Sequence, residues 1–234
     1  MSFTSNTPDI ARHIAAVRGE ISRFEQKYER DSGSVELLAV SKTKPSSLVR
    51  AAAAEGQIAF GENYADEGAE KCVELQELNL IWHYIGHIQS NKTKLIASHY
   101  DWVQGVDRLK IAKRLDEHRN TGHPLNICIQ LKIDAEESKS GCTTDELDEL
   151  AAYIANAEHL TLRGLMAIPA PRTDLSGQRE VFAELHHWYQ KLKHSYSSVD
   201  TLSMGMSGDM EAAIAEGATM VRIGTAVFGA REKR

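Results

Sequence analysis

The feature that most constrains the fold of this 234-residue chain is a strict alternation of short apolar strands and amphipathic helices. Apolar and β-branched runs predict eight strands, at residues 35–41, 58–62, 80–86, 101–106, 125–133, 160–168, 200–204 and 219–224. Helical patterns fill the gaps, at residues 45–55, 63–78, 89–98, 108–120, 143–157, 177–194 and 207–216. One further helix is predicted before the first strand, at residues 7–30, with Thr7 as its N-cap and Pro8 at its first helical position.

Eight successive strand–helix units favour a single (β/α)8 TIM barrel over an open doubly wound sheet. The fifth strand distinguishes between these two folds, because its apolar and polar residues alternate. One face carries Leu125, Ile127, Ile129, Leu131 and Ile133, and the other carries Asn126, Cys128, Gln130 and Lys132. The eighth strand repeats this pattern, with Val221 and Ile223 outward and Met220, Arg222 and Gly224 inward. An open sheet would bury both faces, whereas a barrel interior can hold the polar one. We therefore expect one domain over residues 1–234, with the barrel at 35–231.

Composition excludes several classes of protein. The net charge of −6 does not favour a nucleic-acid-binding surface. No apolar run approaches the roughly 20 residues that span a bilayer, and the N-terminus has no signal-peptide pattern. Cys72, Cys128 and Cys142 are far apart and have no metal-ligand spacing, so we expect them to pack in the core and expect no metal site. These observations favour a protein of the reducing cytoplasm, without nucleic-acid or membrane partners.

The first strand delivers a lysine to its own C-terminal end, where (β/α)8 barrels carry their sites. In VELLAVSKTK, alternation puts Lys42 on the same face as Leu38 and Val40. Partial burial lowers the pKa of a lysine, and a neutral amine is what a Schiff-base nucleophile needs. Lys44, one residue before Pro45, is expected at the more solvated rim. The alternative is that both lysines simply extend from the strand end into water.

Two glycine-bearing turns follow the seventh and eighth strands. They read MGMSGDM, which begins at Met204, and IGTAVFG, which contains Gly224. Each turn is predicted to open a helix, so backbone amides and the hydroxyls of Ser207 and Thr225 would meet at one point. Strands seven and eight are where such barrels commonly bind phosphate. The pair of turns therefore predicts a phosphate-bearing ligand.

A lysine suited to a Schiff base, a phosphate site and an inward-facing Arg222 lie together once the barrel closes. They suggest an aldehyde that carries a phosphate, and pyridoxal 5′-phosphate (PLP) is the leading candidate. A Schiff-base aldolase acting on a sugar phosphate would explain the lysine and the phosphate site but leaves Arg222 without a task. The structural alternative for Arg222 is an ion pair with an interior carboxylate such as Glu62.

The same residues resemble a known family. The motifs are VELLAVSKTKP at 35–45, FGENY at 60–64, WHYIGHIQSNK at 82–92, SKSG at 138–141, RGLMAIP at 163–169, LSMGMSGDMEAAI at 202–214 and VRIGTAVFGAR at 221–231. They are similar to the bacterial YggS/PROSC family of pyridoxal phosphate homeostasis proteins, and the resemblance runs from the first strand to the C-terminus.

The resemblance implies a fold like the N-terminal barrel of alanine racemase, with PLP held as a Schiff base on Lys42. It also implies specific neighbours for the cofactor. These are Ser207, Gly224 and Thr225 at the phosphate, Arg222 at the pyridine nitrogen and Asn63 nearby, and we add Met204 to the expected cofactor-binding set. Lys139, in the SKSG motif, resembles a family lysine thought to influence cofactor exchange.

Arg222 favours a carrier over an enzyme, because a guanidinium only donates hydrogen bonds and would leave the pyridine nitrogen unprotonated. The ring is then a poor electron sink. Racemisation would need a second acid–base group, which the related racemases take from a second domain. Only residues 225–234 follow Gly224, so we expect no such domain, and we do not expect Tyr64 or His83 to replace it.

The sequence thus predicts a monomeric, non-catalytic protein that holds PLP, delivers it to PLP-dependent apoenzymes and acts in vitamin B6 homeostasis. A weak PLP-dependent amino-acid racemase or lyase is the alternative.

Overall fold

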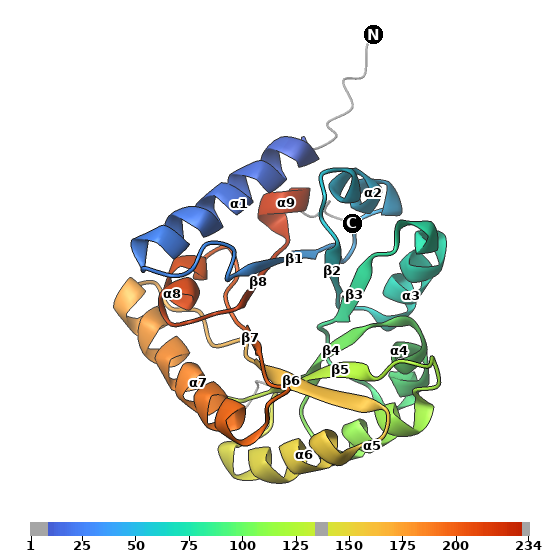
Figure 1. Ribbon diagram of the computed structural model, residues 1–234. Coiled ribbons are helices and arrows are strands. Elements are labelled where there is room, and N and C mark those ends of the chain that lie inside the picture. The colour runs from blue at the N-terminus through green and yellow to red at the C-terminus, as the bar shows by residue number, and fades with distance from the viewer. Residues whose placement is uncertain (1–8, 134–139, 231–234) are drawn as a thin grey trace.

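The sheet is a closed barrel of parallel strands. The computed structural model describes residues 9–133 and 140–230. Within them, eight strands pair in sequence order, and the last pairs with the first. They are β1 (Glu36–Val40), β2 (Ala59–Glu62), β3 (Ile81–Tyr84), β4 (Trp102–Val106), β5 (Leu125–Gln130), β6 (Leu160–Met166), β7 (Thr201–Ser203) and β8 (Met220–Ile223). Figure 1 shows these strands at the centre of a ring of helices. The predicted (β/α)8 architecture is confirmed.

Helices cover the outside of the barrel. They are α1 (Ile10–Lys27), α2 (Ser46–Ala54), α3 (Ala65–Glu74), α4 (Thr93–His99), α5 (Leu109–His118), α6 (Thr144–Asn156), α7 (Leu175–Ser195), α8 (Met210–Ala215) and α9 (Thr225–Phe228). Two short 3₁₀ helices, η1 (Gln76–Leu78) and η2 (Ser90–Lys92), continue α3 and precede α4. None of the described helices combines the length and the apolar character needed to cross a membrane.

Most element boundaries differ from the sequence prediction by one to four residues, and three of them have a visible cause. The first helix begins after Asp9, whose side chain accepts a hydrogen bond from the first helical turn, while Thr7 and Pro8 lie outside the described residues. β5 ends at Gln130 rather than at residue 133, because the next residue forms an isolated bridge with the segment that leads into α6. The helix predicted at 207–216 begins only at Met210. Local side-chain hydrogen bonds to the backbone accompany the two helix starts, and a backbone bridge accompanies the end of β5.

Side chains alternate between the inside of the barrel and its helix-covered outside. The inner apolar cluster consists of Leu38, Val40, Ala59, Ile85 and Met220. Outward residues of the same strands, among them Leu37, Ala39, Val221 and Ile223, belong to the larger core between strands and helices. This is the alternation predicted for the first and eighth strands. Lys42 follows Val40 by two positions and Arg222 follows Met220 by two positions. The alternation therefore places both on the inner side of the barrel.

The N-terminal helix fixes where β1 begins. α1 packs against α8 and α9, and Figure 1 shows it lying along the outside of these two short helices. Near its C-terminal end, the buried carboxylate of Glu25 accepts hydrogen bonds from the amides of Gly33, at 3.1 Å, and Val35, at 2.9 Å. A buried carboxylate with two backbone donors holds a loop firmly. The entry to β1, and hence the position of its far end, is therefore set by α1.

Candidate functional site

Lys42 lies just beyond the C-terminal end of β1. Pairing with β2 continues one residue past the strand, since the Ser41 amide donates to the Gly61 carbonyl at 3.0 Å. The alternation of β1 then puts Lys42 on the inner side of the barrel, and its side chain is half-buried. Thr43 follows with a left-handed φ of 62°. The lysine thus stands at the mouth of the barrel, at the start of a tight turn.

Lys44 has a separate task in the structure. Its ammonium donates to the carbonyl of Ala230 at 2.7 Å, which ties the turn after β1 to the segment after α9. Lys42 and Lys44 are both half-buried, so the prediction that Lys44 is the more solvated of the two stays a prediction. The two lysines of the motif nevertheless differ in position, and only Lys42 is placed to enter the barrel.

Asn63 carries an unsatisfied polar atom beside this turn. It is the first residue after β2, and its Oδ1 is buried and has no hydrogen-bond partner among the described residues. An unpaired buried amide oxygen is costly, so its presence at a strand end calls for a partner from outside the chain. A hydrogen-bond donor of a ligand at the barrel mouth would satisfy it.

The turn after β7 presents free backbone amides. Ser207 lies in a turn closed by Asp209, whose Oδ1 accepts the amide of Met206 at 2.6 Å, rather than at the start of a helix. In the described part of the chain, the amides of Ser207 and Gly208 donate to no acceptor. Both residues are exposed. Their N–H groups and the Ser207 hydroxyl are available to an anion.

The turn after β8 lies beside both β1 and the β7 turn. Thr225 is the first residue of α9, as predicted, and its side chain is exposed. The amide of Gly224 has no acceptor in the described chain, and a Cβ at this position would lie 3.2 Å from the carbonyl oxygen of Val40. The neighbouring Arg222 amide donates to Gly205 at 3.0 Å. These contacts bring the ends of β1, β7 and β8 together.

Arg222 is buried inside the barrel, with an exposed fraction of 4%. Its Nη1 donates to Ser203 Oγ and its Nη2 to the Ala167 carbonyl, both at 2.8 Å. Burial lowers the pKa of Arg222 to about 10, so the guanidinium stays charged at neutral pH. The alternative of an ion pair with Glu62 is wrong, because Glu62 points outward from β2 and bonds to Lys71.

A hydrogen-bonded chain continues from Arg222 across the barrel. Ser203 Oγ donates to Gln104 Oε1 at 2.7 Å, and Gln104 Nε2 donates to His83 Nδ1 at 2.9 Å. Burial lowers the pKa of His83 to about 3, so its ring is neutral and Nδ1 can accept. The ring stacks on Trp102 with centroids 5.0 Å apart. Every donor in this chain points away from Arg222, which fixes the guanidinium in place.

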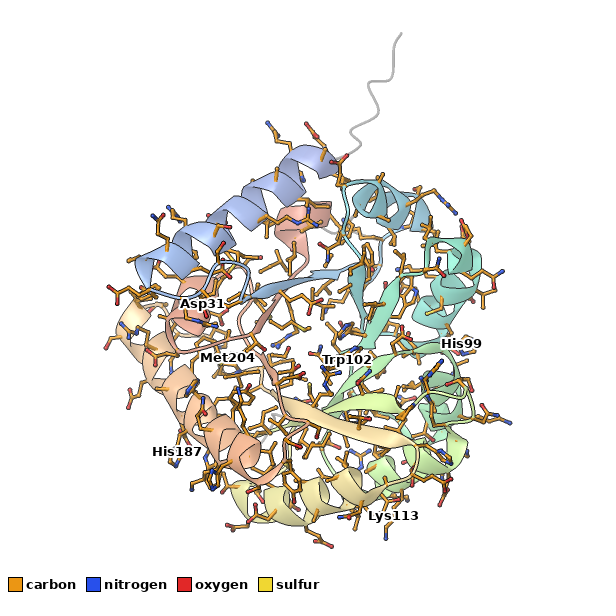
Figure 2. All side chains as sticks on the ribbon, viewed as in Figure 1. Asp31, His99, Trp102, Lys113, His187 and Met204 are labelled. Carbon is orange, nitrogen blue, oxygen red and sulfur yellow. The ribbon has the colours of Figure 1, made fainter. Side chains whose placement is uncertain are left out.

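One residue of the predicted site, Met204, lies elsewhere, and another residue singled out in the sequence cannot be placed. Met204 is completely buried in the core between barrel and helices, so its side chain does not line the mouth. Figure 2 shows it at the barrel wall, within the ring of helices. Lys139 lies outside the described residues. Conversely, sequence reasoning missed Ser203, the partner of Arg222, and Gln104, the partner of Ser203, although both are polar residues within strands.

The site joins an amine, free amides, two hydroxyls and a fixed cation at one end of the barrel. This set suits an aldehyde phosphate, because the lysine can react with the aldehyde while the amides and hydroxyls bind the phosphate. No group of three or more His, Cys, Asp and Glu side chains in residues 9–133 and 140–230 could hold a metal ion. The arrangement therefore fits PLP chemistry on a (β/α)8 scaffold.

Comparison with known proteins agrees with this class. The family model of the alanine racemase N-terminal domain matches residues 13–232. The pyridoxal phosphate homeostasis protein of Escherichia coli K12 is 52% identical over 228 residues, covering 96% of this chain and 97% of that protein. The protein of the same name from Pseudomonas aeruginosa is 53% identical over 224 residues, covering 95% of this chain and 96% of its own.

Solved structures agree as well. PipY of Synechococcus elongatus PCC7942 is 34% identical and covers 94% of this chain and 100% of its own, with TM-scores of 0.84 without PLP and 0.80 with PLP bound. Alanine racemase from Corynebacterium glutamicum shares the fold, with a TM-score of 0.65 and 16% identity over 92% of this chain and 60% of that one. The chain belongs to the alanine racemase N-terminal domain family, and within it to the pyridoxal phosphate homeostasis proteins.

Proposed function

We propose that this protein binds PLP as a Schiff base on Lys42 and acts as a non-catalytic carrier in intracellular PLP homeostasis. The observation that supports the proposal is that Lys42 and the amides of Ser207, Gly208 and Gly224, which have no acceptor among the described residues, follow the C-terminal ends of strands in the same parallel barrel. The names of the curated relatives and the PLP-bound PipY structure support the same ligand.

Each site residue has a defined task in this proposal. Lys42 would hold PLP through its side-chain amine, which would condense with the aldehyde and release one water. Ser207 and Thr225 hydroxyls and the neighbouring amides bind the phosphate. Asn63 Oδ1 accepts a hydrogen bond from the ligand. Bound PLP supplies an electrophilic imine conjugated to a pyridine ring.

The non-catalytic part rests on Arg222 and on the state of His83. A charged guanidinium cannot protonate the pyridine nitrogen, so the ring withdraws few electrons. His83 is neutral, fully buried and already accepts from Gln104, so it cannot serve as the second acid. Tyr64 is 52% exposed at the rim. The proposal includes a reducing, cytoplasmic location, which suits the three free cysteines, and PLP-dependent apoenzymes as recipients.

An absorption spectrum combined with borohydride reduction tests the proposal. PLP added to the protein should give a visible imine band, and reduction should fix the pyridoxyl group on the peptide that contains Lys42, as mass mapping would show. Lys42→Ala should lose the band and the modification. Lys44→Ala, two residues away, should keep both, because Lys44 bonds to Ala230 outside the mouth. Retention of the band by Lys42→Ala would refute the assignment.

A further inference from the structure

A buried lysine on α3 lies directly behind the turn that carries Lys42. The side chain of Lys71 is 6% exposed and packs between two carboxylates. Its Nζ is 2.7 Å from Glu62 Oε1 and 2.7 Å from Glu67 Oε1. The two carboxylates differ in setting, because the Glu62 side chain is completely buried and that of Glu67 is 31% exposed. Lys71 is thus an ion-pair centre enclosed by strands on one side and its own helix on the other.

This cluster holds the backbone on both sides of Lys42. Lys71 Nζ donates to the carbonyl of Ser41 at 2.8 Å, and Ser41 Oγ donates to Glu62 Oε1 at 2.7 Å. On the other side, the amide of Thr43 donates to Glu67 Oε1 at 2.6 Å. Three hydrogen bonds therefore join residues 41 and 43 to Lys71 and its two carboxylates. Lys42 is the residue between them.

The turn needs this restraint because its backbone is strained. Thr43 has a φ of 62°, a left-handed conformation that is unfavourable for a β-branched residue. Such a conformation costs about 1–3 kcal/mol and persists only where surrounding contacts impose it. Relaxation of Thr43 would rotate the peptide that follows Lys42. The hydrogen bond to Glu67 opposes that rotation.

We propose that Lys71, with Glu62 and Glu67, is a positioning residue for Lys42 that holds the strained 41–44 turn so that the Lys42 amine points into the barrel mouth. This inference rests on the proposed function and extends it to residues behind the site. The cluster does not contact the ligand. It sets the geometry in which Lys42 meets an aldehyde, and so the rate at which the protein takes up PLP.

Burial keeps the cluster from rearranging. Desolvation raises the pKa of Glu62, while Lys71 and Ser41 oppose that rise by favouring the carboxylate. Glu62 Oε2 has no partner among the described residues, so Oε1 carries the contacts with both Lys71 and Ser41. α3 itself packs on β2 and β3, which anchors Lys71 to the barrel wall. The 41–44 turn is thus held by residues of α3, which is itself packed on the barrel.

Glu67→Ala tests the proposal, because it removes the acceptor of the Thr43 amide. Glu67 is partly exposed, so we expect the variant to fold. Stopped-flow absorbance would follow imine formation with PLP, and titration with pyridoxine 5′-phosphate, which lacks the aldehyde, would measure binding without the covalent step. Misplacement of a reacting group by about 1 Å slows reactions up to roughly 100-fold. We expect imine formation to slow at least about tenfold, with unchanged affinity for pyridoxine 5′-phosphate.

Two matched variants and a second readout complete the test. Glu67→Gln keeps an oxygen for Thr43 and should restore the wild-type rate, and Glu70→Ala, exposed on the same helix, should not change it. Amide hydrogen exchange of Thr43 in the protein without PLP should accelerate only in Glu67→Ala. The positioning role would be overturned if imine formation in Glu67→Ala were as fast as in the wild type. It would also be overturned if the variant lost affinity for PLP and for pyridoxine 5′-phosphate to the same extent. Absence of any imine in the wild-type protein would instead overturn the proposed function, and this inference with it.

Discussion

Replacing Lys71 with methionine is expected to lower the free energy of unfolding by about 3–5 kcal/mol at pH 7.5. Methionine matches the length of the lysine stem but removes its charge. Glu62 would then be a completely buried carboxylate whose only remaining donor among the described residues is Ser41. Removing one partner of a buried ion pair is costly because the other charge is left without compensation. Urea denaturation of the two proteins at equal concentration measures the difference.

The loss should depend on pH in a defined direction. Burial raises the pKa of Glu62 in the folded protein above its value in the unfolded chain, and removing Lys71 raises it further. The folded state then binds the proton more tightly, so stability falls as pH rises through the folded-state pKa and is regained as pH falls. We therefore expect the difference between wild type and Lys71→Met to shrink from pH 7.5 towards pH 5.

A double variant provides the control. Lys71→Met combined with Glu62→Gln removes both charges and leaves a neutral pair, which should recover much of the lost stability and remove the pH dependence. If Lys71→Met were as stable as wild type, or if the double variant were no better than the single one, the buried pair would not be the source of the effect.

The sequence predicted the barrel and the direction of its key side chains because both depend on short-range periodicity. Alternation along β1 and β8 was enough to put Lys42 and Arg222 inside. The same rule, applied to β2, would have put Ala59 and Gly61 inside and Glu62 outside, which excludes the ion pair between Glu62 and Arg222. That alternative was wrong because it treated a strand-end carboxylate as interior without counting positions.

What the sequence could not provide were contacts between distant side chains. Lys71 looks like an ordinary polar residue of an amphipathic helix, and its bond to Ser41 joins residues 30 positions apart. Gln104 and Ser203 are 99 positions apart and meet only because the barrel closes. Ser207 was predicted at a helix start, but the side chain of Asp209 closes a turn there instead. Helix propensity determines neither the long-range contacts nor this local side-chain bond to the backbone, which competes with the first helical turn.

The buried hydrogen-bonded chain gives Arg222 a role that a surface arginine could not have. Because the donors run in one direction from Arg222 to His83, the guanidinium cannot rotate or exchange partners without leaving Ser203 or Ala167 unsatisfied. Its pKa of about 10 keeps it charged through the physiological range. A fixed positive donor is thus held inside the barrel, and in the proposed function it is the feature that opposes amino-acid chemistry.

If the proposed function holds, Arg222→Glu is expected to raise the activity of the protein towards amino acids. A carboxylic acid at this position can protonate the pyridine nitrogen of bound PLP, and a protonated ring stabilises negative charge at the α-carbon of an amino acid. We expect exchange of the α-hydrogen of amino acids, followed in deuterium oxide by NMR, to rise at least about tenfold over wild type.

Arg222→Gln is the matched control for this gain. The amide has the size of the carboxyl group and can still donate to Ser203 or to Ala167, but it cannot transfer a proton to the ring. Exchange in Arg222→Gln should stay at the wild-type level, while its absorbance should still report bound PLP. Equal exchange in the Glu and Gln variants would show that ring protonation is not what limits the chemistry. Wild-type exchange as fast as that of Arg222→Glu would favour the racemase or lyase alternative, because the charged guanidinium would then be no barrier to turnover.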